Sequence, residues 1–119
     1  MKIPHPQFYI LDGEKRVIPA RDVIEWGHFF ESAARIVEQT DVGDVRVSTV
    51  FLGFDHRLFG DGPPLVFETM IFGGPLNDEQ WRYSSWDDAE TGHAVAVKKA
   101  RKALRAQPGV QVAITRGGE

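Results

Sequence analysis

Short apolar runs separated by glycine, proline and aspartate constrain the fold of this chain more than any other feature. Residues 45–53 are the clearest strand, because they are rich in β-branched and aromatic residues, which favour strands. The second half of this run is apolar on both faces, which indicates a central strand covered on both sides. Further strands are expected at 8–11, 16–19, 65–72 and 81–84, with 110–114 as an additional edge strand.

Two helices complete the predicted order. The first covers residues 23 to about 39, with Asp22 as its N-cap and Glu25 three residues later, a spacing typical of a capping box. Apolar residues recur along it at three- and four-residue steps, as on a helix that packs one face against a core. The second covers residues 86 to about 106 and begins after Ser85, a favourable N-cap.

The resulting order, ββ-α-βββ-α with short connections, favours antiparallel pairing. We therefore expect a single α+β domain over residues 1–119, with about five strands in one antiparallel sheet and two helices packed mainly on one face. The C-terminal tail, about 115–119, is expected to be frayed. Large apolar side chains from both helices and the central strands form the predicted single core: Trp26, Phe30, Val37, Phe51, Phe67, Val97 and Leu104.

The chain contains no cysteine, which excludes disulfides, thiolate zinc sites, iron–sulfur clusters and a cysteine nucleophile. No apolar run approaches the roughly 18 residues of a membrane span. The N-terminal residues lack the apolar stretch and small-residue cleavage site of a signal peptide. We therefore expect a soluble, cytosolic protein with no membrane contact.

Charge is unevenly distributed along the chain. Residues 1–97 hold eight basic and sixteen acidic side chains, whereas residues 98–119 hold six basic and one acidic. Basic residues suit the C-terminal end of a helix because they complement its dipole, and a patch that binds nucleic acid or an acidic partner is the alternative. Aromatic residues do not interleave with them, which disfavours base stacking. The cluster consists of Lys98, Lys99, Arg101, Lys102 and Arg105.

Two histidines and two carboxylates could form a site for acid–base or metal chemistry: Asp55, His56, Glu68 and His93. A carboxylate beside an imidazole can hold its tautomer and raise its basicity. However, these residues show no recognised metal-ligand spacing. We therefore predict no metal, no cofactor and no catalytic residue.

Each member of this group also has a structural interpretation. Asp55 can cap its own loop by bonding the backbone. Glu68 lies in an apolar strand and would need a partner there, such as Arg46 or Arg82 on a neighbouring strand. His93 lies on the inner face of the second helix, where a histidine commonly has its hydrogen bonds satisfied within the core.

The loop from residue 54 to residue 64 is the predicted contact surface. It is long for a hairpin connection, and long loops in small domains are commonly functional or disordered. Its candidate contact residues are Phe54, Asp55, His56, Arg57 and Phe59, and Glu68 and His93 complete the predicted binding set. The alternative is that Phe54 and Phe59 fold back and close the end of the sheet.

Several short strings stand in order between residues 48 and 93. They are STVFLG (48–53), DH (55–56), GPPL (62–65), FETM (67–70), FGG (72–74), RYS (82–84), Trp86, Ala89 and GH (92–93). This pattern resembles a family of small uncharacterised proteins that bacteriophages and prophages encode widely. The resemblance implies a small phage accessory gene whose product acts in the bacterial cytoplasm, and it transfers no activity.

The sequence leads to one functional hypothesis and two alternatives. The hypothesis is a protein that acts by binding a host or phage protein, as an inhibitor of a host defence system such as CRISPR. One alternative is a small metal-assisted or acid–base enzyme that uses Asp55, His56, Glu68 and His93. The other is a pocket protein that sequesters a small ligand such as a signalling nucleotide.

Overall fold

The computed structural model describes residues 8–55, 61–107 and 114–115. Its helices are α1 (Val23–Phe30) and α2 (Trp86–Arg105), and η1 (Ala33–Arg35) is a 3-10 turn. The strands are β1 (Tyr9–Leu11), β2 (Val17–Pro19), β3 (Ile36–Val42), β4 (Val45–Phe51), β5 (Phe67–Phe72), β6 (Gln80–Tyr83) and β7 (Ile114–Thr115). The fold is α+β with antiparallel pairing, which confirms the predicted class.

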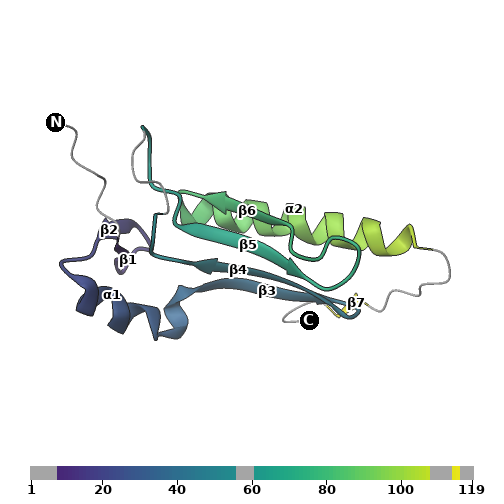
Figure 1. Cartoon of the computed structure of the whole chain (residues 1–119), viewed down its shortest axis with the longest axis horizontal. Helices are drawn as coiled ribbons and strands as arrows, with labels where there is room; N and C mark the ends of the chain where they lie inside the picture. Colours follow the sequence, from purple (N-terminus) through teal and green to yellow (C-terminus); the bar gives the residue numbers. More distant parts are fainter. Residues whose placement is uncertain (1–7, 56–60, 108–113, 116–119) are drawn as a thin grey trace.

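The described strands form two sheets where the sequence predicts one. The larger has the order β6-β5-β4-β3-β7, and β1 and β2 form a separate hairpin. The hairpin is joined to the end of the larger sheet through a bridge between Phe8 and Phe54 and through the Tyr9 amide, which donates to Gly53 O at 2.7 Å. Figure 1 shows this hairpin beside α1 at one end, while α2 runs along one face of the strands.

The predicted helix over residues 23–39 is wrong beyond Phe30. The Ser32 hydroxyl donates to Phe29 O at 2.7 Å, and the chain then passes through η1 into β3. The segment Ile36–Val42 is rich in β-branched residues, which lose rotamer freedom in a helix and pack well in a sheet. Pairing with β4 along its length therefore outweighs the helical spacing of its apolar residues.

The tight turn between β3 and β4 is the sequence feature that indicates a strand at Ile36–Val42. Val42 pairs with Val45, so Gly43 and Asp44 form a two-residue hairpin loop. Gly43 has a φ of 59°, and glycine at the first position is favoured in such a loop. A helix that ends at about residue 39 would place this turn after a helix, whereas the structure places it between two strands.

Alternation along the strands gives the larger sheet one covered and one open face. Val45, Val47, Thr49 and Phe51 of β4 face α2, where all four are buried. The intervening residues face away from α2. The covered face therefore supplies the core, as is common for an antiparallel sheet.

The core is divided into two apolar clusters, whereas the sequence predicts one. The first contains Val42, Val45, Val47, Ile71, Ala96, Val97, Ala100 and Leu104. The second contains Tyr9, Leu11, Phe51, Val66, Phe67 and Ala89, with Val37 packed against it. Trp26 and Phe30 are half-buried and belong to neither, because α1 lies beside β1 and does not lie across the sheet.

The C-terminal prediction is only partly covered by the described residues. Ile114 and Thr115 form β7, which pairs with Val42 and Asp41 of β3. The rest of the predicted edge strand, residues 110–113, and the tail beyond Thr115 lie outside the described residues.

Leu104→Ala tests the first cluster. Leu104 is buried against the sheet, so truncation should lower the free energy of unfolding by about 2–5 kcal/mol. Val95→Ala on the exposed side of α2 is the matched control and should change it by less than about 0.5 kcal/mol. Denaturant unfolding measures both. Equal small effects would show that α2 does not pack on the sheet through Leu104.

Candidate functional site

Helix α1 is strongly apolar but lies at the surface. Five of its eight residues are large and apolar, and none of Val23–Phe30 is buried. Ile24 is 68% exposed and Val23 is 55% exposed, and Ile18 on β2 is 37% exposed. We call Ile18, Val23 and Ile24 the α1 surface. Large exposed apolar side chains of this kind commonly mark a contact site for another protein.

Aromatic side chains on the other side of α1 hold the helix in place. The Trp26 ring stacks on Phe30 at 5.0 Å and lies 5.1 Å from Phe8, measured between ring centroids. Phe29 meets Phe51 edge-to-face at 5.7 Å. Ile24 lies on the outer side, on the same face as exposed His28, and Val23 is exposed at the N-terminal end of the helix.

Local backbone bonds fix the start of α1. The Asp22 carboxylate accepts from the Glu25 amide at 2.9 Å, and the Glu25 carboxylate accepts from the Arg21 amide at 2.8 Å. This arrangement confirms Asp22 as the predicted N-cap. Gly53, at a φ of +68°, allows Trp26 to lie close, since a Cβ there would be 2.6 Å from Trp26 Nε1.

The predicted contact loop is described only at its two ends. The Phe54 ring is half-buried, 5.6 Å from Phe8, and its backbone forms the bridge to the hairpin, in agreement with the fold-back alternative. Asp55 is 1% exposed and so is not part of an exposed contact surface. His56, Arg57 and Phe59 lie outside the described residues.

Glu68 and His93 are not brought together. Glu68 lies on the open face of the sheet, where its Oε2 accepts from Arg82 Nε at 3.1 Å. This is one of the two ion pairs that the sequence predicts for Glu68. His93 lies on α2, against the covered face, and is 1% exposed. The strands therefore separate the two groups.

A chain of hydroxyl groups surrounds His93 between the two apolar clusters. His93 Nε2 lies 2.8 Å from Thr40 Oγ1, and Nδ1 lies 2.7 Å from Thr49 Oγ1. Thr49 and Thr69 are paired across β4 and β5 with their hydroxyls 2.6 Å apart. Tyr83 OH donates to Thr69 Oγ1 at 3.1 Å.

This series of hydrogen bonds fits a neutral His93. With Tyr83 as the first donor, each threonine hydroxyl can donate to the next group, so that Thr49 donates to Nδ1 and Nε2–H donates to Thr40. Burial lowers the pKa of His93, and the Glu38 carboxylate, 4.0 Å from Nε2, partly offsets this effect. His93 is thus a hydrogen-bonded core residue, as its structural interpretation predicts.

The same series of hydrogen bonds requires a glycine at position 92, beside His93. A Cβ at position 92 would collide with the Tyr83 ring. The absence of a side chain lets Tyr83 lie against α2 and reach Thr69. Sequence reasoning missed the roles of the threonines, because each becomes a partner of His93 only through strand register.

Among the described residues, the basic side chains near the end of α2 form no ion pair with an acidic group. Lys98, Lys99, Lys102 and Arg105 are exposed, and Lys99 Nζ lies 5.2 Å from the centroid of the Trp81 ring. This arrangement agrees with a solvated helix end. Nucleic-acid binding by these residues stays a prediction.

The described residues contain no group of three or more histidine, aspartate or glutamate side chains placed to hold a metal ion. Within those same residues, neither helix is long and apolar enough to cross a membrane. Comparison with known proteins gives no match, whether to a family model, to a curated protein or to a solved structure.

The lowered pKa of His93 predicts a pH-dependent stability. The unfolded chain binds a proton near pH 6.5, whereas folded His93 resists it, so the free energy of unfolding should fall as the pH drops below about 6.5. His93→Gln should flatten this slope between pH 7 and pH 5. Denaturant unfolding at each pH measures it. Identical slopes for the His93 variant and the unaltered protein would contradict a buried neutral imidazole.

Proposed function

We propose that this protein acts by binding another protein and that the partner docks on the α1 surface. The supporting observation is that a strongly apolar helix, Val23–Phe30, has no buried residue. Large apolar side chains that a helix leaves exposed to solvent commonly mark an interaction surface. A partner that covers Val23 and Ile24 would remove from water the apolar area that folding leaves exposed.

Burial of these side chains in a complex would contribute favourably to the free energy of binding. Complete burial of one isoleucine or valine side chain contributes about 1.5–3 kcal/mol. Ile18, Val23 and Ile24 are aliphatic side chains that the helix and hairpin already hold in place, so little ordering cost is added on binding. Charged side chains border them, Arg21 and Glu25 among them, as at the rim of an interface.

The biological setting in this proposal is a phage or prophage accessory protein in the bacterial cytoplasm. Its activity would be inhibition of a host defence system, anti-CRISPR activity included, through contact with a host or phage protein. The resemblance of residues 48–93 to small phage and prophage proteins supports this setting. The link from that setting to defence inhibition is one of genetic context and not of chemistry.

The acid–base alternative receives less support from the geometry. It needs Glu68 and His93 in one site, yet they lie on opposite faces of the sheet, and both are already bonded within the fold. Protein binding is therefore the function that the described residues support best.

Ile24→Glu is the direct test. Ile24 is exposed in the isolated protein, so the melting temperature should change little. In a complex the carboxylate would be placed in an apolar contact, and affinity should fall more than about tenfold. The readouts are capture of the partner from infected host lysate and protection of the phage in a plaque assay.

Val95→Glu is the matched control, because Val95 is 50% exposed in the middle of α2, away from the α1 surface. It should retain both capture and protection. If Ile24→Glu and Val95→Glu behave alike in both assays, the partner does not dock on the α1 surface.

A further inference from the structure

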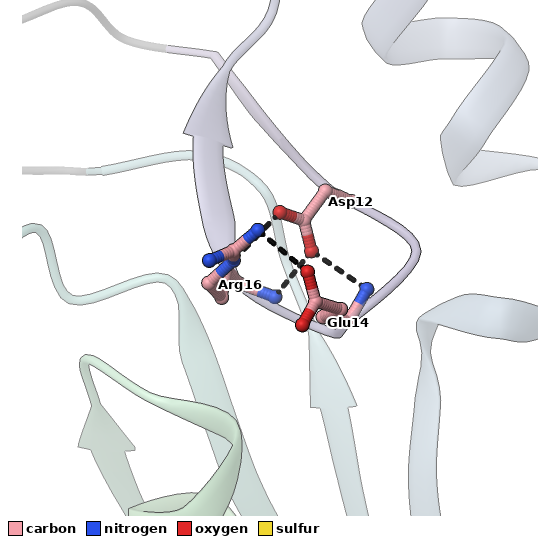
Figure 2. Close-up of polar contacts among 3 residues, drawn as sticks. All are labelled: Asp12, Glu14 and Arg16. Carbon is pink, nitrogen blue, oxygen red and sulfur yellow. Dashed lines mark hydrogen bonds and ion pairs between the residues drawn. The ribbon is translucent and has the colours of Figure 1, made fainter.

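The tip of the β1–β2 hairpin is a closed network of charges. The Asp12 carboxylate accepts from the Glu14 amide at 2.8 Å, the Arg16 amide at 2.9 Å and Arg16 Nε at 2.9 Å. Arg16 Nη2 also donates to Glu14 Oε1 at 2.8 Å, as Figure 2 shows. The backbone amide of Arg16 is the main cause of the lowered pKa of Asp12.

Neither carboxylate of this network forms an ion pair with Lys15. Arg16 is bonded to both acids of the tip, and Lys15 has no ion pair within the described part of the chain. Lys15 stands at a φ of 64°, a conformation uncommon for a residue other than glycine, and its Nζ lies 4.3 Å from the centroid of the Trp86 ring. The turn therefore holds over an aromatic face an ammonium group that forms no ion pair among the described residues.

Two clefts of about 500 and 510 Å³ meet at this point, and Lys15 and Trp86 line both. One is mainly apolar and includes Leu11, Phe29 and Val37. The other lies along Pro63, Pro64 and Ser85. Each has the volume of an ordinary small-molecule site. The first has mainly apolar walls, and the second also carries charged and hydroxyl side chains, Glu14, Arg16 and Asp87 among them.

We propose that these clefts bind a small molecule that carries one carboxylate on an apolar body. The carboxylate pairs with Lys15 Nζ, and the apolar body lies on Trp86 and in the cleft lined by Leu11, Phe29 and Val37. This site uses none of the residues of the α1 surface, and it does not depend on the proposed protein partner.

The charges around Lys15 favour a monoanion over a nucleotide. Glu14 and Asp87 line the cleft beside Ser85, and they would repel the two or more charges of a phosphate chain. Arg16 cannot add a second cation without giving up its bonds to Asp12 and Glu14. A single ammonium group beside an apolar cleft matches a single carboxylate.

The experiment is isothermal titration calorimetry of the unaltered protein with three probes that each carry a ten-carbon chain: decanoate, decanol and decyltrimethylammonium. Decanoate should bind saturably, decanol about fivefold more weakly, and the cation weakest of all, since an exposed ion pair is worth up to about 1 kcal/mol. In nuclear magnetic resonance spectra, decanoate should shift the Trp86 indole signal and leave that of Trp81 in place.

Lys15→Met keeps an unbranched apolar side chain and removes the charge, so it should lower decanoate affinity about fivefold and leave decanol affinity unchanged. Lys98→Met, at an exposed lysine of α2, should bind decanoate as the unaltered protein does. The proposal is overturned if decanoate shows no saturable binding, if the cationic probe binds as tightly, or if Lys15→Met binds decanoate with unchanged affinity.

Discussion

The packing of α2 against one face of the sheet is the contact on which the rest of the structure depends. Both apolar clusters include residues of α2, and the bonded chain from Tyr83 through His93 to Thr40 crosses between them. The hydroxyls around His93 satisfy both ring nitrogens, so a buried imidazole is tolerated in its neutral form. With α2 occupying this face, α1 is left at the end of the molecule, held by aromatic contacts on one side only.

The fold class and most strands could be predicted from turn signals and β-branched runs, but the segment after Phe30 could not. Residues 23–39 carry helical spacing, and Ile36, Val37, Thr40 and Val42 also suit a strand. The strand is favoured over the helix because β4 pairs with this segment over its whole length. Local pattern does not include that pairing, so tertiary contact overrides it.

The interaction partner of a candidate-site residue was predictable where the sequence offered few alternatives. Glu68 needed a cation on a neighbouring strand, and Arg82 supplies it. The exposure of Ile24 was not predictable, because it depends on which surfaces the other elements leave uncovered. The meeting of Lys15 and Trp86 likewise depends on how the hairpin lies against the start of α2.

The central claim is that α1 is an exposed docking surface, and labelling of Ile24→Cys tests it most directly. The chain has no cysteine, so a thiol at position 24 is a unique probe, and Val95→Cys serves as its reference on α2. In the isolated protein both thiols should react rapidly with a maleimide, and infected host lysate should protect position 24 but not position 95. Slow labelling of position 24 in the isolated protein, or equal labelling of both positions in lysate, would contradict the account.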